Sequence, residues 1–221
     1  DKTSLENTTT SIIFTQDQSR IAGLANSISV GTNSATDTSA YVSSDTIYDV
    51  TAYWGSDKST IVVYSPGTIY APQDCSYLFL IDYNQGMAFE KLTNLDLTNF
   101  DTSNVTIMQA MFFYCTSLTS LTFGSNFNTS SVTDMLGMFG GCQSLISLDL
   151  SNFDTAATTN LGQMFAYCIA LTDLNLSNFN TSEVTDIGGM FAACSSLASL
   201  DVSNFNTSNV TNMSSMFSSC T

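Results

Sequence analysis

Cysteine is the residue type with the widest chemistry in this chain, and it recurs at a regular interval of 26 or 27 residues. A thiolate can attack a substrate, ligate a metal or form a disulfide. Zinc sites need pairs of ligands only a few residues apart, and this interval does not supply them. We therefore expect buried free thiols that fill space between repeats, with Cys75 outside the series and without an evident partner. The series consists of Cys115, Cys142, Cys168, Cys194 and Cys220.

A row of carboxylates, amides and hydroxyls forms a second candidate site, because one such residue falls between two inward leucines in each repeat. An acidic row of this kind could bind Ca²⁺, but calcium needs six to eight oxygens that converge on one point, and single residues one repeat apart supply them poorly. We expect a solvated polar face, which is also where a partner would bind an open strand face. The row is Asp96, Thr122, Asp149, Asn175 and Asp201.

Two tyrosines, Tyr114 and Tyr167, each stand directly before a cysteine of the series. The two tyrosines could form an aromatic ridge on the predicted helical side of the repeats, and such a ridge could stack on carbohydrate. Scattered surface aromatics are also ordinary, so both interpretations stay open.

The composition argues against several function classes. The chain has no His, which removes the usual general base and metal ligand, and its carboxylates are spread out rather than gathered. We expect no enzymatic activity, no cofactor and no metal. The net charge is −15, and residues 92–221 contain no Lys or Arg, which argues against nucleic acid, anionic membranes and sulfated glycans as partners. No apolar run is long enough to span a bilayer, so we expect no membrane insertion.

The elements that position these residues come from one repeated phrase, which reads "LSNFNTSEVTDIGGMFAACSSL" over 176–197. Within a copy, the alternation of Leu174 and Leu176 predicts a short strand with one buried face. Asn178 stands where the chain must turn, and its side chain can bond neighbouring backbone groups. The apolar spacing that follows predicts a short helix, formed by Val184, Ile187, Met190 and Phe191. Five copies begin at Leu92, Leu118, Leu145, Leu171 and Leu197.

Equivalent positions of the copies predict ladders of like residues in stacked coils, each of which needs a neighbour to bury its core face. Two phenylalanine ladders are expected, one through Phe100 and Phe179 and one through Phe112 and Phe191. In the third copy, Thr158 takes the place of a valine, and its hydroxyl must find a partner.

The chain divides into three regions by composition. Residues 1–58 are rich in Ser and Thr and either add strands to a β-rich cap or form partly a linker. Residues 59–91 carry two β-rich runs around a Pro-Gly turn and are predicted to cap residues 92–221, the five repeats. We expect an α/β leucine-rich-repeat solenoid with a short strand and a short helix per coil of about 26 residues, preceded by this β-rich N-terminal cap region.

The words "LTNLDLTNFDTSNVTIMQAMFFYCTSL" and "LASLDVSNFNTSNVTNMSSMFSSCT" resemble the BspA-like leucine-rich repeat of bacterial surface proteins, also called DUF285. The resemblance covers about residues 92–221. The upstream stretch aligns Leu78 and Phe79 with the Met-Phe position and Phe89 with the cysteine position, which favours packing over sulfur chemistry there. The resemblance implies an extracellular setting on a bacterial cell surface, a role in adhesion or host interaction, and no enzymatic activity.

Together these observations predict a non-enzymatic adhesion or protein-interaction module. Its partner would be a host or neighbouring-cell surface protein or a neutral glycan. The alternative is a structural subunit of an extracellular filament or matrix. Head-to-tail assembly as a homo-oligomer would cover the apolar coil end near Cys220, and the N-terminal strands could pair with a neighbour's sheet edge.

Overall fold

The structure is a computed structural model that describes residues 9–22, 26–32, 49–54, 56, 59–65, 68–82, 87–88 and 91–220. The position expected for Phe89 lies outside these described residues. The elements in chain order are β1 (Ser11–Thr15), the 3₁₀ helix η1 (Gln18–Ile21), β2 (Asn26–Thr32), β3 (Asp49–Trp54), β4 (Thr60–Tyr64), β5 (Ile69–Tyr70), β6 (Leu80–Asp82), β7 (Met87–Ala88), β8 (Asn94–Leu97), β9 (Phe100–Asp101) and β10 (Ser120–Phe123).

One six-stranded sheet joins the N-terminal strands to the first coils, in the order β10-β8-β1-β4-β3-β2. The pairs from β10 to β4 are parallel, and β3 and β2 add on antiparallel. In β1, Ile12 pairs with Leu95 of β8 and with Ile61 of β4, and all three are buried. Strands from residues 1–58 therefore extend the same apolar strand face that the repeats form.

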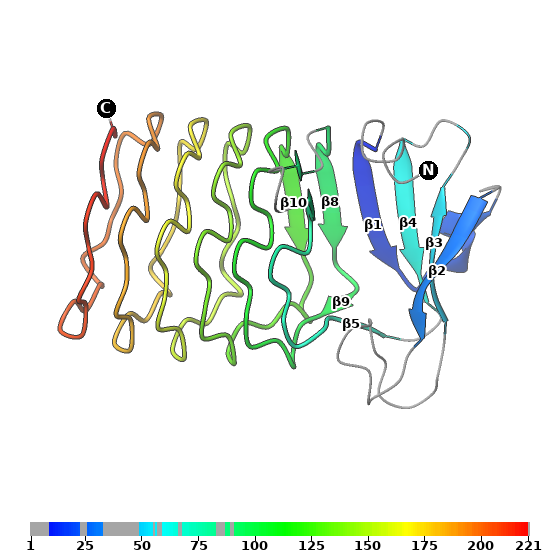
Figure 1. Cartoon of the computed structure of the whole chain (residues 1–221), viewed down its shortest axis with the longest axis horizontal. Coiled ribbons are helices and arrows are strands. Elements are labelled where there is room, and N and C mark those ends of the chain that lie inside the picture. The colour runs from blue at the N-terminus through cyan, green and yellow to red at the C-terminus, as the bar shows by residue number, and fades with distance from the viewer. Residues whose placement is uncertain are drawn as a thin grey trace.

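After β8 the chain winds in coils that stack side by side along the long axis of the molecule (Figure 1). Isolated parallel bridges continue the stack from coil to coil, for example between Ser147 and Asp173 and between Asp186 and Asn212. Backbone hydrogen bonds also join the coils: the N–H groups of Met108 and Phe112 donate to carbonyls of the next coil, at 2.9 Å each. Each coil therefore satisfies much of its backbone only through its neighbours.

The helix expected in each repeat is absent from the described residues of the coils, and this part of the predicted fold class is wrong. Consecutive tight turns take its place, as when the N–H of Met190 donates to the carbonyl of Ile187 at 3.2 Å and that of Cys194 to Phe191 at 3.1 Å. Two residues per coil have positive φ, here Gly189 (+62°) and Ala193 (+59°). Among the described residues, no helix is long and apolar enough to cross a membrane.

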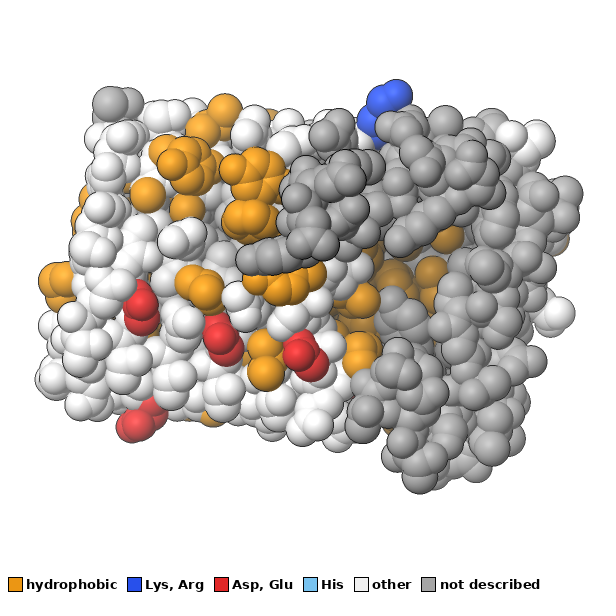
Figure 2. Space-filling view, viewed as in Figure 1, with side chains coloured by type: hydrophobic (Ala, Val, Ile, Leu, Met, Phe, Trp, Pro, Cys, Tyr) orange, Lys and Arg blue, Asp and Glu red, His pale blue; other side chains and the backbone are white. Residues whose placement is uncertain are grey.

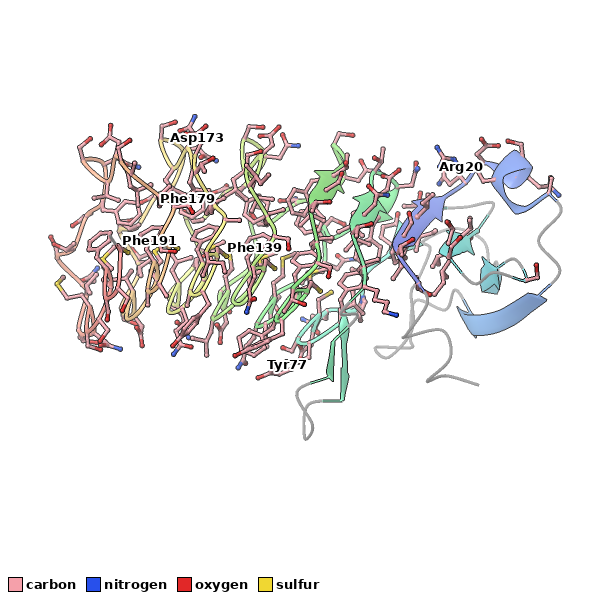
Figure 3. The ribbon with its side chains drawn as sticks, turned by 90° about the horizontal axis from the view of Figure 1, so that it is seen from above. Arg20, Tyr77, Phe139, Asp173, Phe179 and Phe191 are labelled. Carbon is pink, nitrogen blue, oxygen red and sulfur yellow. The ribbon has the colours of Figure 1, made fainter. Side chains whose placement is uncertain are left out.

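Phenylalanine fills the centre of the stack. Phe79, Phe112, Phe139, Phe165, Phe191 and Phe217 form one column, with neighbouring ring centroids 5.3–5.7 Å apart and ring planes within 10° of parallel. This offset stacking agrees with the predicted place of Phe79 in the Phe column. The second column includes Phe127 and Phe153, whose centroids are 5.8 Å apart. Figure 3 places Phe139, Phe179 and Phe191 inside the coils.

Threonine and asparagine side chains join the coils at their corners. Thr102 Oγ1 donates to the carbonyl oxygen of Asn128 and accepts the N–H of the same residue, both at 2.7 Å. Asn178 Nδ2 donates to two carbonyl oxygens of the preceding coil, which is the predicted role of this residue. Thr158 Oγ1 donates to the Val132 carbonyl oxygen at 2.9 Å, so the hydroxyl that replaces a valine has the partner it needs.

Candidate functional site

The cysteine column is buried as predicted, except at Cys220, which is partly exposed. Each thiol after the first donates to a carbonyl oxygen of the preceding coil, as Cys142 Sγ does to Phe112 at 3.2 Å. Burial raises the pKa of the Cys115 thiol to about 12 and that of Cys142 well above its ordinary value. Because the thiolate is the reactive form, these buried groups are poor nucleophiles and poor metal ligands.

Cys75, which does not belong to the cysteine series, lies at the position of Met108 in the preceding coil. Its N–H donates to the Ile107 carbonyl oxygen at 2.9 Å, just as the N–H of Met108 donates to the next coil. The Cys75 thiol donates to the Pro72 carbonyl oxygen at 3.3 Å, and burial raises its pKa to about 12. Cys75 therefore fills a core position that methionine, leucine or isoleucine takes in later coils.

Most residues of the predicted strand-face row accept hydrogen bonds from the backbone of their own coil. In Asp96, Asp149, Asn175 and Asp201, one side-chain oxygen accepts the backbone N–H two residues later, at 2.9–3.0 Å. These Asx turns bend the chain at the same corner of successive coils. The strand predicted beside this corner in every coil is present as β8 and β10 in the first two coils, whereas the described residues of the later coils have isolated bridges instead. Thr122 takes the same place in its coil and is exposed. Ser151 and Ser203 donate to these carboxylates through both the side-chain hydroxyl and the backbone N–H, which holds the pKa of Asp149 and of Asp201 below the ordinary value.

Two further columns of Asx turns lie in the coils, and the sequence reasoning missed them. One includes Asp154 and Asn180, and the other Asp134 and Asn160; each side chain accepts the N–H two residues on, at 2.8–3.0 Å. The sequence signal is an Asp or Asn at the same position of successive repeats; in the second column, Ile107 takes that position in the first repeat. The described residues contain no group of three His, Cys, Asp or Glu side chains placed to hold a metal ion.

The predicted tyrosines lie in one column on the side of the coils formed by the turns. The Tyr114 side chain is 42% exposed and that of Tyr167 is 57% exposed. Gly141 stands between them in the column, and a Cβ atom there would lie 3.2 Å from the Tyr114 ring, so this ring covers the glycine. Both tyrosines have positive φ, +58° and +60°. Figure 2 shows hydrophobic side chains that interrupt an otherwise polar surface of the coils.

A cavity of about 250 Å³ that the sequence did not indicate lies on the same turns, at positions four residues before the column of Tyr114 and Tyr167. Its lining includes Tyr77, Gln109, Phe113 and Gln163. Gln109 Nε2 donates to the Tyr77 hydroxyl at 3.0 Å, and the Phe113 ring packs edge-on against Tyr114 with centroids 4.6 Å apart. Phe113 therefore joins the cavity to Tyr114, and Tyr167 stands four residues after the lining residue Gln163; we call the cavity and the two tyrosines together the tyrosine face. Figure 3 places Tyr77 on the opposite side of the coils from Asp173.

A family model described as "Mycoplasma protein of unknown function, DUF285" matches residues 83–175 and 147–221. The chain belongs to the DUF285 family. Comparison with curated proteins and with solved structures finds no match.

The described surface of this DUF285 chain separates two kinds of polar group. The Asx oxygens at the corners are engaged by the backbone of their own coil, whereas the tyrosine face offers aromatic rings and amides beside a cavity. A signal for that face exists in the sequence. Tyr77, Tyr114 and Tyr167 stand at positions where other coils carry Gly, Ala, Gln or Ser, so a large side chain there is not required by the repeat.

Proposed function

We propose that this chain is a non-enzymatic binding module of a bacterial cell surface, built as a BspA-like leucine-rich-repeat solenoid. The observation that carries the proposal is the tyrosine face, where Tyr114 and Tyr167 are exposed on a stack of coils joined by backbone hydrogen bonds. Rigid arrays that expose aromatic side chains on one face are suited to bind a partner rather than to move groups through a reaction.

The chemistry of the remaining groups supports a binding role. The buried cysteines have raised pKa values, and the described Asx carboxylates serve the turns of the chain. A surface module needs a scaffold of this kind, in which polar corners are fully used and only a limited area is free for recognition. The partner would be a surface protein or a neutral glycan of a host or neighbouring cell.

Head-to-tail assembly into an extracellular filament is the second candidate, and the way the coils stack supports it. Parallel bridges such as that between Asp186 and Asn212 join one coil to the next, and bridges of the same kind could join two chains.

Adhesion of coated beads tests the first candidate. Beads that carry the whole chain should attach to epithelial cell monolayers, and attachment should fall at least about fivefold with Tyr114→Ala and Tyr167→Ala combined, because two exposed rings are lost. Ile146→Ala is the matched control, since Ile146 is 58% exposed but lies near the strand face. Beads that attach no better than uncoated beads would contradict the proposal.

Light scattering on the same sample tests the second candidate: a monodisperse monomer at micromolar concentration rules out assembly into a filament.

A further inference from the structure

We infer that the tyrosine face is a binding site for a neutral oligosaccharide, an inference that rests on the proposed binding function and names its ligand class. Three independent properties of the face lead to this ligand: the strained backbone under its tyrosines, the spacing of its rings, and the absence of charge from its cavity.

The backbone conformation of the tyrosines indicates a role beyond packing. Tyr77, Tyr114 and Tyr167 all have positive φ, between +57° and +60°, and they are the described tyrosines from Ala71 to Cys220. Bulky side chains are disfavoured in this region of backbone space, where glycine is tolerated best. Gly141, at the equivalent position between Tyr114 and Tyr167, shows that the fold accepts glycine there. Ala110, Gln163 and Ala193 share this positive φ, so the conformation comes from the turn of each coil, and what points to function is a bulky ring kept where a smaller residue fits.

The placement of the rings suits a chain of sugar rings. Tyr114 and Tyr167 are two coils apart in one column, and parallel coils at the spacing of paired strands put their backbones about 10 Å apart. Gly141 has no side chain, and the Tyr114 ring lies over it, 3.2 Å from where a Cβ atom would be, so no other side chain of this column separates the Tyr114 ring from Tyr167. A short oligosaccharide can therefore place the C–H face of one ring on each tyrosine, because aromatic faces attract such partially positive hydrogens.

The cavity beside the rings selects for a neutral ligand that carries hydroxyl groups. Its lining side chains include the amides of Gln109 and Gln163 and the rings of Tyr77 and Phe113, and the described residues of the lining carry no charge. Without Lys or Arg in residues 92–221, an anionic glycan would meet a net negative chain with no cation to pair with. Amides both donate and accept hydrogen bonds, as sugar hydroxyls do. The Gln109 amide is already oriented by its bond to the Tyr77 hydroxyl.

Titration calorimetry of the whole chain with neutral tetrasaccharides (cellotetraose, chitotetraose and mannotetraose) tests the inference, with a heparin tetrasaccharide as the anionic comparison. At least one neutral tetrasaccharide should bind and the heparin fragment should not. Tyr114→Ala with Tyr167→Ala should weaken that binding at least about tenfold. Alanine is tolerated at these positions, since Ala193 takes the equivalent place at φ +59°. Tyr114→Phe with Tyr167→Phe, which keeps both rings, should stay within about threefold of the unchanged chain, as should Ile146→Ala.

Two results would overturn the inference: no neutral tetrasaccharide binds, or binding is the same in the alanine double variant. The two experiments distinguish failure of the glycan inference from failure of the adhesion proposal. If beads attach to cells through the tyrosine face and no sugar binds, the partner is a protein and the glycan inference fails alone. If a tetrasaccharide binds at Tyr114 and Tyr167 but coated beads do not attach to cells, the site stands and the adhesion proposal fails.

Discussion

Thr155 shows how a single hydroxyl joins two coils. It is fully buried, its Oγ1 donates to the Asn180 carbonyl oxygen at 2.9 Å, and it accepts the N–H of Asn180 at 2.8 Å. Thr155→Val keeps the shape of the side chain and leaves both backbone groups of Asn180 without this partner. We expect the free energy of unfolding in urea to fall by about 1–3 kcal/mol. Thr155→Ser, which retains the hydroxyl, should lose clearly less, and equal losses in the two variants would contradict the role of the hydrogen bonds.

The Cys115 thiol makes stability depend on alkaline pH. Its pKa is raised to about 12 in the folded chain, against 9.0 for an ordinary thiol, because burial disfavours the thiolate. Between these two values the unfolded chain loses the proton and the folded chain keeps it, so stability is fully present below pH 9 and falls as pH rises toward 12. Melting temperatures measured from pH 7 to 11 should fall less steeply in Cys115→Ala than in the unchanged chain. Parallel curves for the two proteins would show that this thiol is not the cause.

At the scale of the elements, the Asx turns at Asp149 and Asp201 make the stability of the fold depend on pH in the acid range. Asp149 and Asp201 have lowered pKa values because the N–H and hydroxyl groups of Ser151 and Ser203 bond to the carboxylates. Their contribution to stability is therefore present above the unfolded-state value of about 3.9 and is lost as pH falls through the folded-state pKa. Asn175 makes the same turn with an amide, at 3.0 Å from the Ser177 nitrogen to its oxygen.

The Asn175 turn defines the variants for this test. Asp149→Asn with Asp201→Asn should keep both turns, leave the melting temperature at pH 7 nearly unchanged, and reduce its drop between pH 5 and pH 2.5. The reverse change, Asn175→Asp, should increase that drop. A loss of stability at pH 7 in the double variant would mean that the charge, not the turn, matters at these corners.

Much of the column structure could be predicted from the sequence, but the helix could not be told from turns. The apolar offsets of Ile187, Met190, Phe191 and Cys194 match one face of a helix. The structure has overlapping turns instead, in which an N–H donates to the carbonyl three residues earlier. These turns bury side chains at the same spacing as a helix does. What separates the two is positive φ at positions such as Gln163 and Ala193, residues that carry no preference for that conformation. The tyrosine face depends on the same turns, so its cavity was not predictable either.

At the scale of the whole molecule, the N-terminal strands join the coils through contacts that sequence patterns do not encode. Ser11 of β1 pairs with Asn94 of β8, which is 83 residues later in the chain, and Phe14 lies 4.8 Å from Phe100 between ring centroids. The alternation in "SIIF" predicts a strand but not its neighbour. Among the described strands, the outermost at this end of the sheet is the antiparallel β2, whose pairing with β3 is interrupted between Ser29 and Gly31. A bulge at an edge discourages pairing with another sheet, which weighs against the filament alternative at this end.

Because coils contact only their neighbours, removal of one whole coil should leave the rest intact. Deletion of residues 172–197 removes 26 residues, brings Leu171 next to Ala198, and keeps every column in phase. It also keeps Tyr114 and Tyr167. We expect a cooperative unfolding transition, an unchanged circular dichroism signal per residue, and a molecule shorter by about 5 Å in small-angle scattering.

The matched control is the deletion of residues 172–184, which removes half a coil. Thr185 is a corner residue, and its N–H donates to the Thr159 carbonyl oxygen at 2.8 Å. The deletion moves Thr185 to the position of Thr172, directly after Leu171. It also takes Phe191 out of phase with Phe165. The coils after Leu171 should then lose their order, although fewer residues are missing, and the melting transition should broaden. If both deletions unfold the chain to the same extent, stability is not divided among neighbouring coils, and the N-terminal sheet and the coils fold as one indivisible unit.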